Sequence, residues 1–349
     1  MNTIEIAGRL VGPGHPCFVI AEAGVNHNGD LALAKRLVEA AATAGADAVK
    51  FQTFSAERMA SRGAPKAKYQ LEQTDPTESQ VEMLRRLELS PEAHRELHAY
   101  CRKYGVLFLS TPFDEVSADL LAELGLPAFK IGSGEITNWP FLDYIARKGK
   151  PIILSTGMSF LSEVDEAVRV IRNAKCDQLA LLHCVSNYPA DPSDANLYAI
   201  RTLAVAFDVP VGYSDHTSGI EVALAATALG ACVIEKHCTV NRQLPGPDHC
   251  ASLEPHELRQ MVAGIRTVQA SLGTGGKWPA SSEAKNRLVA RRSVAAACNI
   301  PEGAVIRPEM LRALRPASGI SPALTECVVG RRARRPLMEG QLISWGDLE

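Results

Sequence analysis

The sequence lacks the features that would place it in several large protein classes. Aromatic residues make up only 5% of it, its formal net charge is −2, and no two cysteines stand at CxxC spacing. A charge so close to zero gives no general attraction to nucleic acid or to anionic membranes. No apolar run is long enough to span a bilayer, and the first six residues lack the basic and then apolar pattern of a signal peptide. We therefore expect a cytoplasmic protein with no nucleic-acid or membrane partner.

Cysteine usage supports the same expectation. The nine cysteines are odd in number, and many of them lie in apolar stretches, among them Cys17, Cys184 and Cys232. Buried, reduced thiols are the ordinary state of such residues in a cytosolic protein. The sequence therefore predicts no cysteine site.

A strand–turn–helix pattern repeats eight times between about residue 17 and residue 273. Helix-period segments, such as 31–45, 91–105, 161–174 and 254–273, separate the short apolar runs. This alternation implies parallel strands joined by right-handed crossovers, and eight such units close naturally into a (β/α)8 TIM barrel. An open, doubly wound sheet is the alternative. The predicted strands are 17–24, 47–54, 106–113, 128–135, 151–158, 178–186, 209–216 and 231–238.

The two ends of the chain depart from this pattern. Residues 3–12 alternate between apolar and polar, which predicts a hairpin over the base of the barrel. Residues 274–284 are predicted to form a linker. The tail after it contains a short internal repeat, in which Glu302-Gly303-Ala304-Val305-Ile306 recurs as Glu339-Gly340-Gln341-Leu342-Ile343. We therefore expect a catalytic barrel domain over 1–273, with the hairpin at its start, and a small, pseudo-symmetric, β-rich domain over 285–349.

Every predicted barrel strand carries polar residues at its carboxyl end. Barrel enzymes place their active sites at this end, whereas a purely structural barrel would show solvated polar residues without a pattern. The sequence therefore predicts an active site there. In chain order the residues are Glu22, Asn26 and His27; Lys50 and Gln52; Ser110 and Thr111; Lys130, Ser133 and Glu135; Ser155 and Thr156; His183, Ser186 and Tyr188; Ser214 and His216; and Glu235 and His237.

Two histidines end the last two strands, which are neighbours in a barrel. Side chains two residues apart share a face of a strand, so Glu235 and His237 point to the same side and Lys236 points away. Two imidazoles completed by water suit Mn²⁺, Zn²⁺ or Fe²⁺ better than Mg²⁺. A single histidine in such a place is more often a hydrogen-bonded core residue, but the pair His216 and His237 favours a metal site.

Two lysines suggest an anion site at the same end. Lys50 and Lys130 end the second and fourth strands, with the hydroxyls of Thr111, Ser133, Ser155 and Ser214 nearby in the pattern. Ammonium groups and hydroxyls together bind phosphate and carboxylate oxygens. The alternative use of a barrel lysine is a Schiff base with a carbonyl substrate.

Linked motifs run along the whole chain. In chain order the barrel motifs are Ala21-Glu22-Ala23-Gly24-Val25-Asn26-His27-Asn28-Gly29, Val49-Lys50-Phe51-Gln52-Thr53, Leu109-Ser110-Thr111-Pro112-Phe113, Lys130-Ile131-Gly132-Ser133-Gly134-Glu135, Leu154-Ser155-Thr156-Gly157-Met158, Gly212-Tyr213-Ser214-Asp215-His216-Thr217, Ile234-Glu235-Lys236-His237 and Gly246-Pro247-Asp248-His249. These motifs resemble the N-acetylneuraminate (sialic acid) synthase family, legionaminate-type synthases included. The tail, with Arg315-Pro316 and Gly319-Ile320-Ser321-Pro322, is similar to the family's antifreeze-like (SAF) domain.

The resemblance implies a fold, a reaction and partners. The fold is a (β/α)8 barrel followed by a SAF domain, in a domain-swapped homodimer whose SAF domains cap the partner's active site. The reaction is a transfer that joins phosphoenolpyruvate to an N-acetylated hexose. The cofactor is a divalent metal, Mn²⁺ by preference, with Mg²⁺ or Co²⁺ as alternatives.

The resemblance also implies roles for individual residues. His216 and His237 would hold the metal, and the catalytic residues would be Glu22, Lys50, Lys130 and Glu135. Phosphoenolpyruvate would lie against Lys50, Thr111, Lys130, Ser133, Ser155, Ser186 and Ser214, although some family members have asparagine at the position of Ser186, which leaves Asn187 as an alternative. The sugar would meet Gln52, Tyr188 and Asp248, together with Arg315 from the partner's tail.

Three readings of the function remain open at the level of sequence. The first is synthesis of N-acetylneuraminate from N-acetylmannosamine, with synthesis of N,N'-diacetyllegionaminate from 2,4-diacetamido-2,4,6-trideoxy-mannose as its alternative. The second is a Schiff-base aldolase on a similar barrel. The third is a non-enzymatic protein that binds carbohydrate or ice through its tail.

Overall fold

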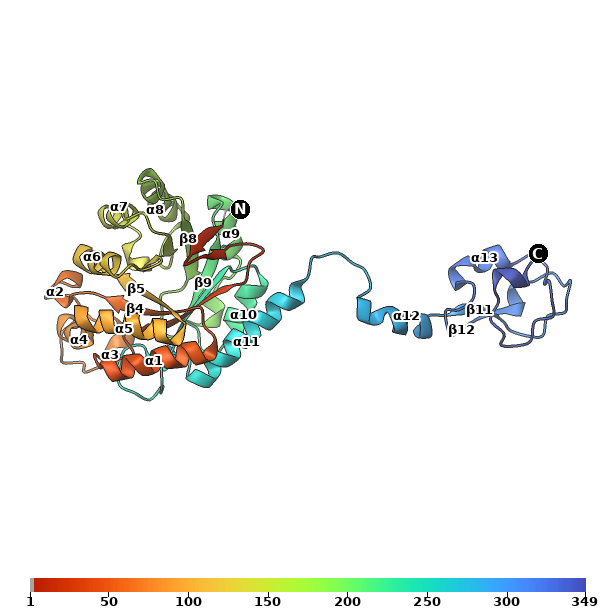
Figure 1. Cartoon of the computed structure of the whole chain (residues 1–349), viewed down its shortest axis with the longest axis horizontal. Coiled ribbons are helices and arrows are strands. Elements are labelled where there is room, and N and C mark those ends of the chain that lie inside the picture. Colours follow the sequence, from red (N-terminus) through yellow and green to blue (C-terminus); the bar gives the residue numbers. More distant parts are fainter. Residues whose placement is uncertain (1–2) are drawn as a thin grey trace. The chain divides into compact units, whose positions relative to one another are not determined.

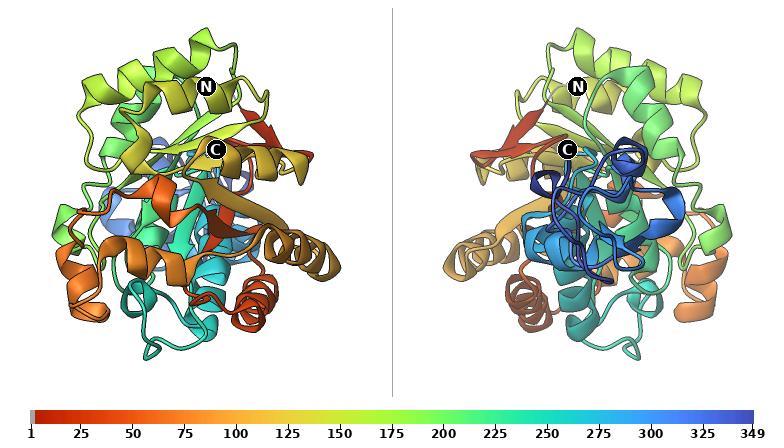
Figure 2. Two further views of the ribbon diagram at one scale, coloured as in Figure 1. Left: turned by 90° about the vertical axis from the view of Figure 1, so that its left-hand side faces the viewer. Right: turned by 90° about the vertical axis from the view of Figure 1, so that its right-hand side faces the viewer.

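The structure is a computed structural model that describes residues 3–349, apart from the side chain of Glu72. It divides into two compact units, which part after Gly273. The first unit is a barrel of parallel strands surrounded by helices (Figures 1 and 2). Within residues 3–349, no helix has the length and apolar character needed to cross a membrane.

The barrel contains eight parallel strands in the order β5-β4-β3-β10-β9-β8-β7-β6, and its outermost strands, β5 and β6, lie beside each other. The sheet is therefore nearly closed, which confirms the predicted barrel and excludes the open sheet. Six strands end within two residues of the predicted ends, whereas the fourth and fifth end earlier. After Ile131 the chain turns into η1 (Ser133–Glu135), and after Ser155 it enters the loop before the next helix. The strands are β3 (Phe18–Gly24), β4 (Ala48–Thr53), β5 (Leu107–Pro112), β6 (Phe129–Ile131), β7 (Ile152–Ser155), β8 (Leu179–Cys184), β9 (Val211–Asp215) and β10 (Val233–His237).

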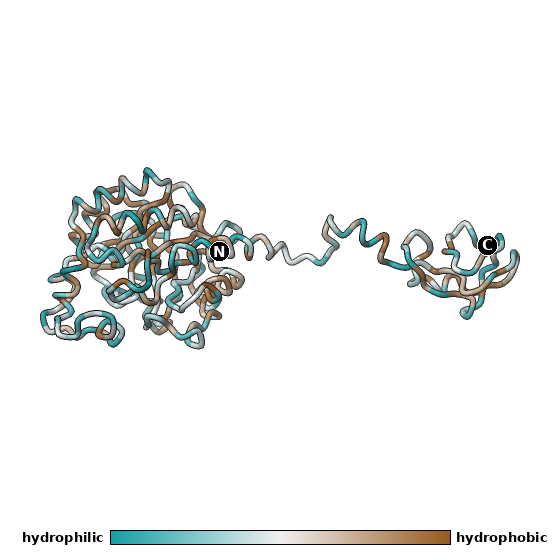
Figure 3. The backbone as a smooth tube through the Cα atoms, turned by 90° about the horizontal axis from the view of Figure 1, so that it is seen from below, coloured by the Kyte–Doolittle hydropathy of each residue, from teal (hydrophilic) through white to brown (hydrophobic). Residues whose placement is uncertain are grey.

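Helices follow the strands because the sequence between them has one apolar face and clear end signals. In α1 (Leu31–Ala44), Asp30 caps the first turn by accepting a hydrogen bond from the Ala32 amide, and Gly45 ends the helix with φ of 81°. The buried face of each helix packs on the outer face of the strands, and apolar and polar segments alternate along the helices in Figure 3. The others are α5 (Pro91–Tyr104), α6 (Glu115–Glu123), α7 (Trp139–Ala146), α8 (Leu161–Asn173), α9 (Ala199–Phe207), α10 (Glu221–Ala228) and α11 (Pro255–Leu272).

The connection between β4 and α5 is an exception to this regularity. It contains three short helices, α2 (Ala56–Met59), α3 (Lys68–Gln73) and α4 (Gln80–Leu87). A small apolar cluster of its own anchors it, in which Val81 and Leu84 of α4 pack with Val25 and Phe54 at the barrel. This connection is therefore an ordered part of the carboxyl end of the barrel.

The base of the barrel is closed by the predicted hairpin. Strands β1 (Ile4–Ile6) and β2 (Arg9–Val11) pair antiparallel, and Ile4, Ile6 and Val11 pack against side chains that fill the barrel's interior, such as Ile20. Because apolar residues fill this end, the polar interior positions are confined to the other end of the strands.

The second unit has its own small core. Strands β11 (Ser293–Ala296) and β12 (Leu311–Leu314) pair antiparallel, and α12 (Ala284–Ala290) and α13 (Thr325–Val328) are its helices. The two copies of the internal repeat have the same local structure. Gly303 and Gly340 both turn the chain with positive φ, and a 3₁₀ turn follows each glycine, before Leu311 and Leu348 respectively. Residues such as Ile306 and Ile343 fill the core.

Candidate active site

Four buried charged side chains meet inside the carboxyl end of the barrel. Lys50 Nζ lies 2.7 Å from Glu22 Oε2 and 3.8 Å from Glu235 Oε2, while Lys130 Nζ lies 3.6 Å from Glu235 Oε1. All four residues are between 1% and 4% exposed. Parallel strands β3, β4, β6 and β10 each contribute one of them, so the cluster depends on closure of the barrel.

Burial and neighbouring charges divide the two carboxyl groups into different states. Burial raises the pKa of Glu22 to about 7, although the Lys50 ammonium opposes the shift. Burial acts in the same direction on Glu235, but the ammonium groups of Lys130 and Lys50 outweigh it and lower the pKa of that carboxyl. Glu235 is therefore a permanent carboxylate, while Glu22 can gain or lose a proton near neutral pH.

The two lysines also differ. Burial tends to lower the pKa of Lys50, but Glu22 and Glu235 outweigh it and raise that pKa. Burial lowers the pKa of Lys130, for which Glu235 gives only partial compensation. A bound anionic ligand would add negative charge beside Lys130 and so stabilise its ammonium form.

Hydroxyl groups surround the lysines as the sequence predicted. Lys50 Nζ donates to Thr111 Oγ1 at 3.0 Å, and Lys130 Nζ donates to Ser155 Oγ at 2.7 Å. Ser214 Oγ donates to Glu235 Oε1 at 3.0 Å, which holds this carboxylate between the two ammonium groups. The structure therefore brings Thr111, Ser155 and Ser214 to the lysines.

Ser133 and Ser186 form a second group of hydroxyls around Gly157. The Gly157 amide donates to Ser133 Oγ at 2.9 Å. A Cβ at position 157 would lie 2.4 Å from Ser186 Oγ and 3.0 Å from Ser133 Oγ, so only glycine allows this close approach. Both serines therefore stand at the turn that follows Ser155, the partner of Lys130.

His216 and His237 also converge, with ring centroids 5.4 Å apart. The Val185 carbonyl, 2.6 Å from His216 Nδ1, can only accept a hydrogen bond, so Nδ1 carries the proton and Nε2 keeps a lone pair. His237 Nδ1 is buried and has no hydrogen-bond partner within residues 3–349. Burial lowers the pKa of His216 to about 4 and that of His237 well below its usual value, so both rings are neutral.

These observations fit a divalent metal. A metal ion binds the neutral form of an imidazole, through a nitrogen lone pair. The buried Nδ1 of His237, which has no hydrogen-bond partner among the described residues, is available for such a bond. Among the described residues, no three His, Cys, Asp or Glu side chains are grouped closely enough to hold a metal by themselves. A metal at His216 and His237 would therefore take its other ligands from water or substrate.

Three residues predicted to meet a sugar lie beside the histidines or the lysine cluster. The Tyr188 ring packs against His216 with centroids 4.2 Å apart and an angle of 35° between the rings, and Asp248 Oδ2 lies 3.8 Å from His237 Nδ1. Gln52 Nε2 donates to Glu22 Oε1 at 3.4 Å. Burial raises the pKa of Asp248 to about 6. Gln52 thus contacts the lysine cluster, while Tyr188 and Asp248 contact the histidine pair.

One predicted residue makes its hydrogen bond outside this cluster, and another belongs to the second unit. Glu135 lies in η1, where its Oε2 accepts a hydrogen bond from Asn138 Nδ2 at 2.7 Å. Arg315 belongs to the second unit and is exposed there. The catalytic role of Glu135 and the sugar contact of Arg315 stay predictions.

One central residue had been recognised at a strand end but given no role. Glu235 contacts both lysines and Ser214, and its alternation with His237 was the only signal in the sequence. Its neighbour Lys236 points outward, where its Nζ pairs with Asp215 Oδ2 at 2.7 Å in a fully buried ion pair. The alternation along β10 therefore separates a site residue from a structural one.

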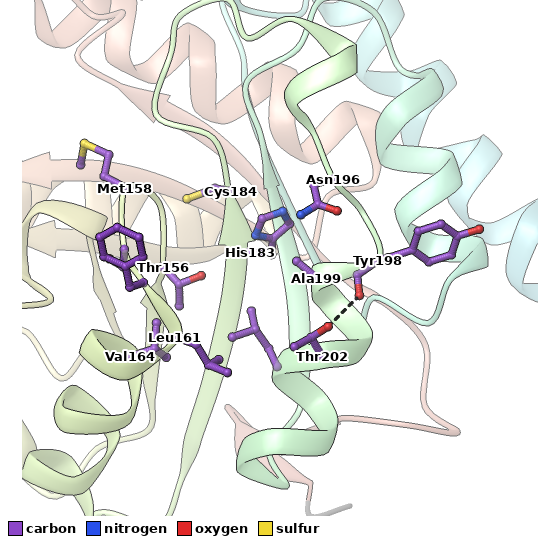
Figure 4. A pocket seen from close by; sticks show the side chains of 13 residues that line it. Thr156, Met158, Leu161, Val164, His183, Cys184, Asn196, Tyr198, Ala199 and Thr202 are labelled. Atoms are coloured by element: carbon purple, nitrogen blue, oxygen red, sulfur yellow. Dashed lines mark hydrogen bonds between the residues drawn. The ribbon is translucent and has the colours of Figure 1, made fainter.

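Polar strand ends outside the cluster have structural contacts. Asn26 Nδ2 donates to the Cys238 carbonyl and to Ser252 Oγ, and His183 Nε2 donates to the Ala195 carbonyl at 2.9 Å. His183 also lines a cavity of about 510 Å³ between α8 and α9, together with Cys184 and Thr156 (Figure 4). Neither the lysines nor the paired histidines line this cavity, but Cys184 does, and its Sγ lies 3.2 Å from Ser133 Oγ.

Comparison with known proteins matches this arrangement to one family. The model of the NeuB family matches residues 37–277, and that of the SAF domain matches residues 291–349. The chain is 51% identical to the N,N'-diacetyllegionaminic acid synthase of Campylobacter jejuni, over 93% of this chain and 98% of that protein. It is 48% identical to the synthase of the same name from Legionella pneumophila, over 97% of this chain and 96% of that protein.

A solved structure agrees with these relatives. The N-acetylneuraminic acid (sialic acid) synthetase of Leptospira borgpetersenii, in complex with citrate, is 38% identical, with a TM-score of 0.73 over 82% of this chain and 95% of that one. The matched family model covers most of the barrel, and the relatives cover nearly the whole chain. The chain therefore belongs to the NeuB family and carries a SAF domain at its carboxyl end.

Proposed function

We propose that this protein condenses phosphoenolpyruvate with an N-acetylated amino sugar in its open-chain form, giving a nine-carbon 2-keto acid and phosphate. The observation that carries the proposal is the buried cluster of Glu22, Lys50, Lys130 and Glu235 beside two neutral histidines. The lysine cluster suits a small, dense anion and the histidines suit a metal, so the same end of the barrel would serve two different substrates.

The lysine side of the cluster would bind phosphoenolpyruvate. Lys50 and Lys130 offer positive charge, while Thr111, Ser155 and Ser214 offer hydroxyls beside them. Ammonium groups fixed in a dry site stabilise negative charge far better than in water and need no reorganisation during the reaction. Glu235 limits the positive charge before the substrate arrives.

The histidine side would hold the cofactor, for which Mn²⁺ is the predicted ion. A divalent metal bound to His216 and His237 would supply Lewis-acid polarisation of the sugar's aldehyde. The protein's own part is to keep both rings neutral, which burial achieves, and to orient the His216 ring, which the Val185 carbonyl achieves.

The reaction requires carbon 3 of the enol to attack the aldehyde carbon, which leaves positive charge on carbon 2. Water then adds to carbon 2, and the tetrahedral intermediate expels phosphate by cleavage of its carbon–oxygen bond. Glu22 is suited to the proton transfers, because a carboxyl whose pKa is about 7 can both accept and donate a proton at neutral pH. Fixing both substrates beside each other supplies much of the remaining acceleration.

The identity of the sugar is the finer part of the proposal. The sequence led first to N-acetylmannosamine, with 2,4-diacetamido-2,4,6-trideoxy-mannose as the alternative. The relatives at 51% and 48% identity are named for N,N'-diacetyllegionaminic acid, whereas the N-acetylneuraminate-9-phosphate synthase of Homo sapiens is 39% identical. This difference favours the diacetamido sugar.

A Schiff-base aldolase is the second candidate, and one observation favours it. The lowered pKa of Lys130 is a property of lysines that form imines. Borohydride in the presence of substrate would trap such an adduct on Lys130, whereas the proposed condensation leaves both lysines unmodified.

The oligomeric state belongs to the same proposal. We expect a domain-swapped homodimer in which Arg315 of each tail recognises the partner's N-acyl sugar. Arg315→Ala should then raise the KM for the sugar far more than the KM for phosphoenolpyruvate, and light scattering should give twice the chain mass.

The experiment that tests the function measures phosphate release from phosphoenolpyruvate and the mass of the product. N-acetylmannosamine and 2,4-diacetamido-2,4,6-trideoxy-mannose are offered in parallel, each with Mn²⁺ or with a chelator. We expect metal-dependent release and a nine-carbon product, with the diacetamido sugar preferred. Release that is unaffected by the chelator would contradict the metal part, and no release with either sugar would contradict the condensation.

A further inference from the structure

Two charged side chains stand in the layer between the barrel strands and their helices. Asp215 of β9 and Lys236 of β10 point outward, where parallel strands covered by helices usually carry apolar residues. Tyr213 and Ile234, two residues earlier on the same faces, belong to the apolar core of this layer. Both charged side chains are 0% exposed, and Lys236 Nζ lies 2.7 Å from Asp215 Oδ2. The two residues therefore form an ion pair that is fully enclosed in the core.

Stability alone does not account for this pair. Two charges lose their hydration on burial, and replacing a buried ion pair with well-packed apolar residues is often neutral or stabilising. Asp215 and Lys236 are distinguished by their place in the chain. Each of them stands between two residues of the candidate active site, in the runs Ser214–His216 and Glu235–His237. The pair therefore lies directly behind the site.

The backbone pairing of the two strands ends at the same place. The register of β9 against β10 runs from Tyr213 and Ile234 to Asp215 and Lys236. Strand β9 also ends at Asp215, so His216 lies beyond the strand. Backbone hydrogen bonds between β9 and β10 therefore do not by themselves fix the position of one histidine relative to the other.

Side chains continue the connection where the backbone pairing stops. Lys236 Nζ also donates to the Thr217 carbonyl, and so reaches past His216 to the residue that follows it. Asp215 Oδ1 accepts hydrogen bonds from the Thr217 amide at 2.9 Å and from its hydroxyl at 2.7 Å. One ammonium group of β10 thus holds the residues on both sides of His216, and His237 follows that lysine directly in the chain.

These contacts form in a dry environment. Asp215, Thr217 and Lys236 are all 0% exposed, so water does not compete for the hydrogen bonds, and charged groups make the stronger ones. The Val185 carbonyl, 2.6 Å from His216 Nδ1, has a different effect, because it orients the His216 ring without any contact to β10. The ion pair is therefore the side-chain connection that joins the two histidine-bearing segments.

We propose that Asp215 and Lys236 are positioning residues, whose ion pair holds His216 and His237 in the relative arrangement that a divalent metal needs. Neither side chain would touch the metal, because both face away from the interior of the barrel. The inference rests on the proposed function and deepens it at the metal site.

The test measures metal binding and not only turnover. Calorimetric titration of the metal-free, full-length chain with Mn²⁺ gives the Kd. The electron paramagnetic resonance spectrum of the bound Mn²⁺ reports the arrangement of its ligands, and urea unfolding without metal gives the stability of each variant.

A double variant separates position from stability. Asp215→Leu combined with Lys236→Met replaces the pair with apolar side chains, so the free energy of unfolding should stay near that of the wild type or rise. Because the Thr217 carbonyl loses its ammonium partner, the Kd for Mn²⁺ should rise by about 10-fold to 100-fold, the usual effect of removing a residue that supports a metal ligand. The spectrum of bound Mn²⁺ should change as well. A folded double variant with the Kd and spectrum of the wild type would overturn the inference.

Single variants test the charge itself. Lys236→Arg keeps a cation that can donate to both Asp215 and the Thr217 carbonyl, whereas Lys236→Met removes it. Lys236→Arg should therefore bind Mn²⁺ more tightly than Lys236→Met, and equal Kd values in the two would contradict the role of the ion pair. This comparison also decides the matter if the double variant does not fold.

Lys66→Met provides the matched control. Lys66 is another buried lysine, but its Nζ contacts Thr74, Asp75 and Glu78, which lie with it in the connection between β4 and α5. Its replacement should lower the free energy of unfolding and leave the Kd for Mn²⁺ unchanged. A Kd that rises as much as in Lys236→Met would be a general effect of lost stability, and the inference would be wrong.

The outcomes separate this inference from the proposed function. A wild type that binds Mn²⁺ but releases no phosphate with either sugar contradicts the condensation alone, because the Kd values of the variants are measured without turnover. A wild type that binds no Mn²⁺ overturns the inference together with the metal part of the proposed function. Metal-dependent turnover by a wild type whose Kd for Mn²⁺ the double variant shares overturns the inference alone.

Discussion

The two ends of the barrel both carry clusters of charged side chains, but the charges are satisfied in different ways. At the base, Asp47 Oδ1 pairs with Arg9, and its Oδ2 accepts hydrogen bonds from the Val19 amide at 2.8 Å and from Arg266 at 2.9 Å. At the carboxyl end, Glu235 Oε2 and His237 Nδ1 have no hydrogen-bond partner within residues 3–349.

This difference shows which charges serve the fold and which serve the chemistry. The base network ties the hairpin, β3 and α11 together, and its arginines are partly exposed, so little desolvation opposes it. The cluster at the carboxyl end is buried and incompletely satisfied, a state that lowers stability unless ligands complete it. Polar groups that violate the usual rules of burial are expected at functional sites.

The largest expected effect comes from removing one of the incompletely satisfied groups. His237→Ala should abolish metal-dependent turnover, because one of two protein ligands is lost, while the fold is kept. Calorimetric titration with Mn²⁺ and the phosphate-release assay measure this. His183→Ala, a matched change of a histidine that donates to a backbone carbonyl, should keep Mn²⁺ binding. Near-normal turnover with bound metal in His237→Ala would contradict the two-histidine site.

A change of one cation at each end compares the two clusters directly. Lys130→Met should lower kcat/KM for phosphoenolpyruvate by about 1000-fold, the upper effect of removing one group that stabilises charge in a dry site. Arg266→Met at the base should leave kcat/KM unchanged and lower the free energy of unfolding by about 1 to 3 kcal/mol, because a charged hydrogen bond to Asp47 is lost.

Phosphate release and urea unfolding of both variants provide the measurements. If Arg266→Met lost activity as strongly as Lys130→Met, the separation of roles between the two ends would be wrong. If Lys130→Met kept most of the activity, the anion site would have to be elsewhere.

The last expected effect is a pH dependence of stability that arises at Glu22. Its pKa is about 7 in the folded chain and 4.5 in a model peptide, so between these values the folded chain holds a proton that the unfolded chain has lost. The contribution of Glu22 to the free energy of unfolding therefore falls as pH rises from 4.5 to about 7.

Glu22→Gln should remove this fall, which urea unfolding at several pH values would detect. Glu57→Gln, at an exposed carboxyl whose pKa is lowered by its hydrogen bond to Arg85, should not remove it. If the free energy of unfolding of Glu22→Gln fell with pH as steeply as that of the wild type, Glu22 would not hold a proton between pH 4.5 and about 7. The buried charges at the carboxyl end would then not lower stability through Glu22.

Much of the fold could be predicted because the barrel repeats one local pattern. The apolar period of each segment depends only on neighbouring residues, and signals such as Asp30 and Gly45 mark helix ends within one turn. The fourth strand was predicted over 128–135 but ends at Ile131. The prediction extended too far because η1 carries polar and apolar residues in an order that also suits a strand.

The sequence by itself determined the barrel, the polar character of its carboxyl end and the faces on which Glu235, Lys236 and His237 lie, since alternation along a strand is a local property. Only the tertiary structure decided that Glu235 stands between Lys50 and Lys130, that Glu22 titrates near neutral pH and that Lys236 pairs with Asp215. These features depend on distances and burial across strands and connections far apart in the chain, which no local pattern encodes.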